Sequence, residues 1–382
     1  MHEVKSITRR IKPEVERELW ARAAGRCEFS GCNTLLYRSR VTQEAVHYAE
    51  KAHIWAFSKD GPRGRGPFTT DTTGLNEVDN LLLLCPVCHL KIDTEPTRYS
   101  AGLLKGWKRE HERRVELVTG ISPLKQSLVV MYRAPVGDVA AQLTPHDAME
   151  ALFPDWYPAT STPVEIGMRW EGRDTDPDYW RMEEAQLGRQ FERLQLTGAF
   201  DHQHFSLFGF APIPLLARLG ALFTDQVPAE VYQRHREPKQ TWRWLPGATE
   251  TPYQAIPPSN VAGSPVLVLA LSDRIALDRV TSVVGEAASI WQLTIPTPEN
   301  DFLKYPDQLS AYRRALRTLI DEIGRVHGKH VPISIFPAIP VACAVDLGRI
   351  RMPKVDAPWE VFDHNRAQNR FVHAITLGGT NG

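Results

Sequence analysis

Short apolar runs alternate with longer amphipathic segments through the C-terminal two thirds of the chain. Runs rich in β-branched residues predict strands at Leu128–Tyr132, Val164–Met168, Val266–Leu271 and Ile290–Ile295. Two longer segments, Tyr179–Leu196 and Gln308–Gly324, repeat apolar residues at helical spacing and predict helices that bury one face. Strands that alternate with helices are typical of parallel α/β units. We therefore expect α/β sheets covered by helices in this part of the chain.

The same two thirds contain an internal duplication. Residues 205–222 and 333–350 align without a gap at an offset of 128, and Gly220 falls opposite Gly348 in this alignment. Sequence self-similarity at a fixed offset indicates that one structural unit occurs twice.

The duplication extends beyond this aligned block. After a two-residue insertion, Val231–Trp244 and Val361–Leu377 each predict a strand, a polar turn and a second strand. The sequence therefore predicts one pseudo-symmetric domain over residues 121–382, with repeats at about 125–245 and 262–380.

The N-terminal third has shorter predicted elements. Pro13–Ala24 predicts a helix, because proline lies at its start, apolar residues recur every fourth position and Gly25 can end it. Residues 34–49 predict a strand or hairpin, and residues 52–57 predict a strand. The glycine- and proline-rich run 61–67 predicts a loop.

Two further helices complete this third. A helix that begins at Pro86 would carry His89 and Asp93 on adjacent turns. A second helix over Leu103–Val118 mixes lysine and arginine with glutamate from Trp107 onward. We expect this helix to be a solvated connector rather than a DNA-reading helix.

Charge is balanced over the 382 residues, with 45 Lys+Arg and 45 Asp+Glu. Residues 1–120 carry 20 basic and 16 acidic residues, a small excess that fits either contact with nucleic acid or chance unevenness. Arg63 and Arg65 in the loop 61–67 likewise fit either contact with phosphates or solvation of the loop.

The sequence favours a protein of the reducing cytoplasm. No apolar run approaches the roughly 20 residues that span a bilayer, so we expect no membrane association. The first residues have no apolar signal-peptide core. Four of the five cysteines form two close pairs, which is not the pattern of a secreted disulfide framework, and Cys343 in an apolar run is expected to be a buried hydrophobe.

The two cysteine pairs predict a metal site. Cys27 and Cys32 enclose four residues, and Cys85 and Cys88 enclose two. Four thiolates in two short turns can close a tetrahedral zinc site. Because all four positions are protein ligands, such a zinc ion is structural and has no open position for water.

Three polar residues accompany the cysteine pairs. They are His53 within Ala52-His53-Ile54, Asn80 before a run of four leucines, and His89 directly after Cys88. On these residues, the segment 13–95 resembles the HNH endonucleases. The resemblance implies an α+β domain over residues 1–120, with a ββα-metal core, a structural zinc and a connector helix.

The residue types suggest a mechanism. Hydrolysis of a phosphodiester needs an activated water and neutralisation of charge on the departing oxygen. His53 is the expected general base, because an unperturbed imidazole titrates near neutrality. A hard divalent ion such as Mg²⁺ would polarise the phosphate. The resemblance implies that His89 binds this ion and that Asn80 orients the His53 imidazole or its loop.

One position departs from the HNH pattern. Many HNH enzymes have an acidic residue or a second histidine just before the base, as a metal ligand, and this chain has Ala52 there. Glu50, His47 and Asp93 are the alternatives for the missing ligand.

An HNH domain followed by a duplicated Rossmann-like domain resembles the HNH–SAVED effector nucleases of bacterial CBASS anti-phage defence. SAVED domains are fused pairs of CARF-like α/β units that bind cyclic oligonucleotides. The resemblance implies that a cyclic di- or trinucleotide, made by a partner nucleotidyltransferase, causes self-association and degradation of double-stranded DNA. Neither repeat contains a Gly-x-Gly-x-x-Gly or Walker motif, which disfavours a dinucleotide cofactor or NTP hydrolysis.

The ends of the predicted strands supply candidate ligand contacts. Ligands in open α/β sheets bind beyond the carboxyl ends of strands, and two fused copies would bring two such edges to one cleft. Aromatic rings can stack on bases, and cations can meet phosphates. The candidate contacts that follow strands are Tyr132, Arg133, Trp170, Ser272, Asp273, Arg274, Lys304 and Tyr305.

Two other functions fit the same sequence. A restriction-type HNH nuclease would read DNA through its C-terminal part and cut without a small activator. A zinc protein with an inactive HNH pocket would bind a nucleotide or metabolite only, and Ala52 keeps this alternative open.

Overall fold

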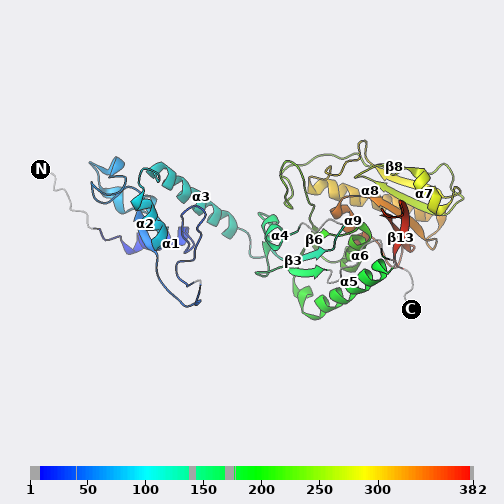
Figure 1. The fold of residues 1–382 in the computed structure, drawn as a ribbon, viewed down its shortest axis with the longest axis horizontal. Coiled ribbons are helices and arrows are strands. Elements are labelled where there is room, and N and C mark those ends of the chain that lie inside the picture. The colour runs from blue at the N-terminus through cyan, green and yellow to red at the C-terminus, as the bar shows by residue number, and fades with distance from the viewer. Residues whose placement is uncertain (1–8, 40, 137–142, 168–175, 177, 379–382) are drawn as a thin grey trace. The chain divides into compact units, whose positions relative to one another are not determined.

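The computed structural model describes residues 9–39, 41–136, 143–167, 176 and 178–378 (Figure 1). The chain divides into two compact units, Met1–Ser122 and Pro123–Gly382, which we name unit 1 and unit 2. Within the described residues, no helix is both long and apolar enough to cross a membrane.

Unit 1 is built on a two-stranded antiparallel sheet. Its elements are α1 (Pro13–Arg22), β1 (Glu50–His53), β2 (Leu81–Leu84), α2 (Pro86–Thr94) and α3 (Ala101–Thr119), with 3-10 turns at Gly66–Phe68, Thr73–Asn76 and Val78–Asn80. His53 pairs with Leu81 at the end of the sheet. The four leucines of β2 are all buried and form a core with residues of α1, α2 and α3. This arrangement confirms the three predicted helices and a ββα core, but the four leucines that form its second strand were not predicted as a strand.

Two predicted segments of unit 1 differ in the structure. The strand expected over residues 52–57 stops at His53, because the Ile54 N–H donates to the Asn80 carbonyl and the Ala56 N–H donates to the Gly64 carbonyl. Residues 34–49 form no regular strand, and the isolated bridge Arg38–Ala45 pairs the two sides of this segment. Short-range hydrogen bonds in loops therefore replace a longer ladder.

The first half of unit 2 is a parallel sheet with helices. Its strands are β3 (Gln126–Arg133), β4 (Tyr157–Pro158), β5 (Val164–Gly167), β6 (Phe205–Phe210) and β7 (Ala229–Val231). Its helices are α4 (Pro145–Ala151), α5 (Tyr179–Leu196) and α6 (Ile213–Phe223), with a 3-10 turn at Ala199–Asp201. The strand order is β4-β3-β6-β7. Strand β4 pairs with the start of β3, and β5 pairs with the second half of β3, from Val130 to Arg133.

The second half forms a six-stranded sheet. Its strands are β8 (Gln254–Ile256), β9 (Pro265–Ala270), β10 (Ser289–Thr294), β11 (Ile333–Ala338), β12 (Trp359–Asn365) and β13 (Arg370–Leu377). Its helices are α7 (Leu277–Val284), α8 (Pro306–His327) and α9 (Val341–Arg349). The order is β13-β12-β11-β9-β10-β8, with antiparallel strands β8 and β13 at the edges.

The predicted duplication is confirmed by strand order. In the first half, β3 lies between β5 and β6, and β7 follows β6. In the second half, the equivalent strand β9 lies between β10 and β11, and β12 follows β11. Two parallel units of the same topology thus follow one another in the chain, as expected of fused Rossmann-like units.

The predicted hairpins are confirmed in only one half. Val361–Leu377 forms most of β12 and all of β13, whereas Val231–Trp244 contains only the last residue of β7 and a single bridge between His235 and Thr241. In this segment the N–H groups of Arg236 and Glu237 donate to the Asp301 carboxylate, at 3.1 and 3.0 Å. A side chain of the other half therefore takes the place of a partner strand.

Helices α6 and α9 join the two halves (Figure 1). A Cβ atom on Gly220 would lie 1.8 Å from the Val345 carbonyl oxygen, and one on Gly348 would lie 1.8 Å from the Ala217 carbonyl oxygen. The offset of 128 relates Gly220 to Gly348 and Ala217 to Val345. The two contacts are therefore equivalent under the duplication, and the helices cross backbone against backbone about a pseudo-twofold axis.

We expect Gly220→Ala to destabilise unit 2 by at least about 2 kcal/mol, because its methyl group would have to push the two helices apart. The control is Gly188→Ala in α5, where a Cβ atom meets nothing within 4 Å. Alanine there should leave stability unchanged or raise it by about 0.5–1 kcal/mol. Urea unfolding followed by tryptophan fluorescence measures both, and equal midpoints for the two variants would contradict the close crossing.

Candidate functional site

The four cysteines predicted to bind zinc converge in unit 1. Their sulfur atoms all lie within 4.8 Å of one another, and the Cys32 and Cys85 sulfurs are 4.0 Å apart. A tetrahedral zinc ion with bonds of about 2.3 Å places its sulfur ligands roughly 3.8 Å apart. The donor set and its spacing therefore fit a metal ion of this kind.

Local structure brings these sulfurs together. Cys27 follows α1, and the turn to Cys32 passes through Gly31 at a positive φ of 81°. Cys85 is the N-cap of α2, and Cys88 lies in its first turn. The Cys85 N–H donates to the Cys27 sulfur at 3.3 Å. Burial raises the pKa of the Cys27 thiol to about 12, so a thiolate at this position needs a cation that balances its charge.

Glu28 anchors the first cysteine turn to the sheet and was missed by the sequence analysis. Its N–H donates to the Leu83 carbonyl at 3.0 Å, and its carboxylate accepts from the Leu83 N–H at 2.6 Å. Lys108 of α3 lies 3.7 Å from this carboxylate and 2.7 Å from that of Glu112. Burial raises the pKa of Glu28 to about 7, against the charge of Lys108.

The prediction that α3 is a solvated connector was therefore wrong for one face of the helix. Lys108 is 4% exposed and His111 is 8% exposed, because this face of the helix packs on the cysteine turn and α1. The His111 ring contacts the Ala23 carbonyl at 3.0 Å. A lysine among glutamates gave no sign in the sequence that one face of this helix is buried.

His53 lies at the end of β1 with a half-buried ring. Its Nε2 atom is 3.0 Å from the Oδ1 atom of Asn76, a contact that the sequence analysis missed. Burial lowers the pKa of His53, more than the Asn76 contact raises it. The lowered pKa favours the neutral ring, the form in which an imidazole accepts a proton.

Asn80 holds the chain that follows His53 and does not contact its ring. The Asn80 amide donates to the carbonyls of Trp55 and Leu75, at 3.0 and 2.9 Å, and accepts from the Trp55 N–H at 2.9 Å. Asn80 is 2% exposed, so these bonds satisfy a buried polar side chain. Of the two roles expected for Asn80, the structure places it in contact with the loop.

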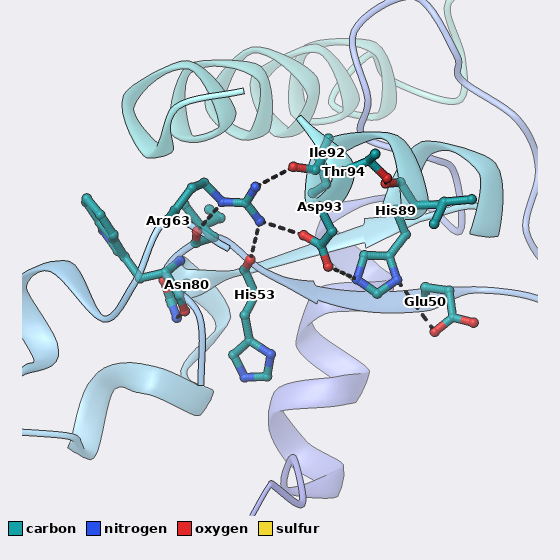
Figure 2. A network of polar contacts seen from close by, with 11 residues as sticks. Glu50, His53, Arg63, Asn80, His89, Ile92, Asp93 and Thr94 are labelled. Carbon is teal, nitrogen blue, oxygen red and sulfur yellow. Dashed lines mark hydrogen bonds and ion pairs between the residues drawn. The ribbon is translucent and has the colours of Figure 1, made fainter. Parts of the chain in front are cut away.

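His89 lies between two carboxylates (Figure 2). Its Nε2 atom is 3.3 Å from Asp93, one turn further along α2, and its Nδ1 atom is 3.9 Å from Glu50 at the start of β1. The hydrogen bond to Asp93 raises the pKa of His89, more than burial lowers it. Partial burial raises the pKa of Asp93, but the bonds from His89 and Arg63 lower it further, so this pKa lies below its usual range. His89 thus has one carboxylate next to each ring nitrogen, and an ion bound to one nitrogen would meet the carboxylate on that side only. Among the described residues, the four cysteines are the group of three or more ligand atoms that converge.

The other predicted residues of unit 1 lie elsewhere. His47 is exposed and packs edge-on against Trp20, with ring centroids 6.2 Å apart. Arg65 donates to the Phe57 carbonyl at 3.0 Å. Arg63 fits neither predicted role, because its side chain is 3% exposed and bonds to the protein interior rather than to solvent.

Unit 2 contains a cavity of about 620 Å³ between α4 and the segment 234–246. Its walls include two tryptophans, three cations and two acids: Trp242, Trp244, Arg234, Lys239, Arg243, Asp147 and Glu150. The volume falls within the range of about 300–1,000 Å³ that is typical of small-molecule sites. The sequence Trp242-Arg243-Trp244 combines aromatic rings with a cation and could have predicted a nucleotide contact in this segment.

Two of the predicted ligand contacts support this cavity from outside. Arg133 pairs with Glu165 and donates to the Leu143 carbonyl at 3.2 Å, next to the wall residue Thr144. The Lys304 carbonyl accepts from the N–H of the wall residue Leu245 at 3.2 Å. The Lys304 ammonium pairs with Asp301.

The remaining predicted contacts are not brought together. Tyr132 is 2% exposed inside the core, so it cannot reach a ligand on the surface, and this prediction is corrected. Ser272 and Arg274 follow β9 and do not line the cavity, whereas Tyr305 caps α8 and packs on Gly247. Asp273 is exposed beside Arg274. Trp170 lies outside the described residues.

Comparison with protein families identifies both units. The profile of the SAVED family, described as the SMODS-associated and fused to various effectors sensor domain, matches residues 187–377, which is half of the chain. The chain belongs to the SAVED family. The profile of the HNH endonuclease matches residues 27–95, which include the four cysteines, His53, Asn80 and His89. The SAVED protein thus also contains a segment that matches the HNH endonuclease profile.

Comparison with solved structures found similar SAVED receptors. The Acinetobacter baumannii Cap4 SAVED/CARF-domain containing receptor with the cyclic trinucleotide 2'3'3'-cAAA matches with a TM-score of 0.41 and 11% identity, over 76% of this chain and 60% of that chain. The Moraxella osloensis Cap4 receptor matches with a TM-score of 0.37 and 11% identity, over 76% and 59%. The chain spans about three fifths of the length of these proteins. Comparison with curated proteins found no match.

We expect Asn80→Asp to destabilise unit 1 by about 1–3 kcal/mol, because the carboxylate cannot donate to the buried carbonyls of Trp55 and Leu75. The matched control is Asn76→Asp, which keeps an acceptor oxygen for the His53 ring. Thermal unfolding compares the two variants. A melting temperature for Asn80→Asp at or above that of Asn76→Asp would show that the loop does not depend on the amide.

Proposed function

We propose that this SAVED protein is a metal-dependent endonuclease that degrades double-stranded DNA when a cyclic di- or trinucleotide binds its sensor unit. The observation that carries the proposal is the presence of an HNH site and a SAVED domain in one chain. Such a protein would act in CBASS anti-phage defence, and activation would proceed by self-association in the cytoplasm.

In the nuclease unit, His53 acts as the general base. Its neutral ring takes a proton from the attacking water, and the contact with Asn76 holds one ring nitrogen in place, so the other is available to the water. Asn80 keeps the main chain after His53 in one conformation through Trp55. The base is thereby presented by a rigid strand end rather than by a mobile loop.

A divalent ion such as Mg²⁺ would be held by His89 with the carboxylate next to its bound nitrogen, Asp93 at Nε2 or Glu50 at Nδ1. When bound, it would supply positive charge to the phosphate and the departing oxygen. A carboxylate beside His89 would take the place of the acidic residue or second histidine that many HNH enzymes have at the position of Ala52. His47 packs against Trp20 and is not part of the proposed metal site. The four-cysteine site holds zinc and has a structural role.

In the sensor unit, the cavity between α4 and the segment 234–246 is the proposed ligand site. Trp244 offers a ring face to a base, whereas Trp242 is 3% exposed and packs on Phe208 behind the wall. Arg234, Lys239 and Arg243 offer charge to phosphates. Arg133 and Lys304 would act indirectly, because they bond to residues in or next to the wall. Ser272, Arg274 and Tyr305 stay predictions for contacts outside this cavity.

The proposal predicts ligand-gated cleavage of DNA. The purified protein with Mg²⁺ should degrade plasmid only in the presence of one member of a panel of cyclic di- and trinucleotides. His53→Ala should lower the rate at least about 100-fold, because loss of a general base typically costs 10²–10⁴-fold. Cleavage without any cyclic nucleotide would instead identify a restriction-type nuclease. Ligand binding without cleavage by the wild-type protein would identify a pure sensor.

The proposal also predicts one structural zinc per chain. Elemental analysis of the purified protein should give equimolar zinc, and Cys88→Ser should lose the metal and lower the melting temperature of unit 1. Cys343→Ala is the control, because Cys343 is buried in the core of unit 2, whereas the four cysteines of the cluster belong to unit 1. Zinc retained at full content by Cys88→Ser would contradict the four-thiolate site.

A further inference from the structure

Arg63 is the buried cation of the nuclease site. It lies in the glycine-rich loop at a positive φ of 64°, and its side chain is 3% exposed. The guanidinium donates to the carbonyls of Ile54 and Ile92, at 2.7 and 2.6 Å. It also donates to the His53 carbonyl at 3.2 Å and to the Asp93 carboxylate at 2.9 Å. A buried guanidinium with this many protein acceptors is not free to meet a phosphate of DNA.

These bonds connect the two elements that carry the histidines. His53 ends β1 and Ile54 follows it, whereas Ile92 and Asp93 lie in the last turn of α2. Figure 2 shows the Arg63 guanidinium between the strand and the helix. The Asp93 carboxylate lies between this guanidinium and the His89 ring. The last carbonyls of a helix lack partners within the helix and favour a cation. Arg63 therefore binds the end of α2 at the same time as the end of β1.

The Asp93 carboxylate is divided between two partners. Its Oδ1 atom accepts from Arg63, and its Oδ2 atom lies 3.3 Å from the Nε2 atom of His89. An ion pair to a 3% exposed arginine removes the rotational freedom of this carboxylate and leaves one oxygen directed at the imidazole. Such outer partners typically change metal affinity or activity by about 10–100-fold.

We propose that Arg63 is a positioning residue of the nuclease site, which fixes the His53 strand against α2 and holds Asp93 in line with His89. This inference rests on the proposed metal site at His89 and adds a residue that touches neither the metal nor DNA. The planar guanidinium is needed for this role, because it directs donors to four separate acceptors, whereas a lysine ammonium has three donors at one point.

The first experiment compares Arg63→Lys with Arg65→Lys in the full-length protein. Arg65 lies in the same loop and donates to one main-chain carbonyl, so its substitution controls for the change of residue type. Mn²⁺ affinity is measured by calorimetry without DNA or nucleotide, and kcat and KM are measured with activated enzyme. We expect Arg63→Lys to bind Mn²⁺ about 10–100-fold more weakly and to lose kcat with an unchanged KM for DNA. Arg65→Lys should match the wild type in Mn²⁺ affinity.

Two results would overturn the proposal. A raised KM for DNA with unchanged Mn²⁺ affinity and kcat would make Arg63 a DNA contact. Unchanged Mn²⁺ affinity, kcat and KM in Arg63→Lys would show that the bonds of the Arg63 guanidinium have no effect on the site. Because Mn²⁺ binding needs neither ligand nor cleavage, weaker binding by Arg63→Lys would support the inference even if the wild type cut no DNA.

A second variant covers the case in which Arg63→Lys fails to fold, as judged by its melting temperature and zinc content. Asp93→Asn keeps the three main-chain bonds of Arg63 and removes the charged oxygen that faces His89. It should weaken Mn²⁺ binding by about 10-fold or more, with zinc content unchanged. Full Mn²⁺ affinity in a folded Asp93→Asn protein would refute the proposal that Arg63 acts on His89 through Asp93. Absence of Mn²⁺ binding by the wild type would refute it as well.

Discussion

Backbone contact between α6 and α9 is the constraint on which the sensor unit depends. Each helix comes from one copy of the duplicated unit, and each brings a glycine to the crossing because the other helix leaves no space for a Cβ atom. The large core around this crossing includes residues of both sheets, from Leu128 to Leu377. The two copies therefore form one body with a shared core, rather than two α/β domains on a linker. Burial of apolar surface on both sides of the crossing stabilises this arrangement.

The nuclease unit is held together differently, because its regular sheet is only two short strands. Where a longer ladder would pair main-chain groups, side chains do so instead. Asn80 binds the chain after His53, Glu28 binds β2, and Arg63 binds the ends of β1 and α2. Buried polar groups are costly unless they are paired, so these side chains specify one conformation for each loop. The convergence of four sulfurs adds a further cross-link at the start of α2.

The two histidines of the site have opposite environments, which suits different roles. Burial lowers the pKa of His53 although the contact with Asn76 raises it, whereas the carboxylates around His89 raise the pKa of that ring. A position that stabilises a proton on an imidazole between two carboxylates also suits a metal ion, which is the proposed occupant. Pairs of titratable groups whose pKa values move apart are typical of sites that divide acid–base work from charge stabilisation.

The sequence by itself determined the α/β duplication, the helices of unit 1, the cysteine cluster and the residues of the HNH motif. These features depend on periodicity, spacing and residue type, which local sequence carries directly. Only the tertiary structure decided that Lys108 is buried, that Arg63 binds carbonyls, that Tyr132 lies in the core and that Asn76 meets His53. The same residue types are usual on surfaces and in loops, so their sequence pattern is ambiguous. Their roles depend on which distant main-chain groups and side chains the fold brings beside them, and no spacing along the chain encodes that proximity.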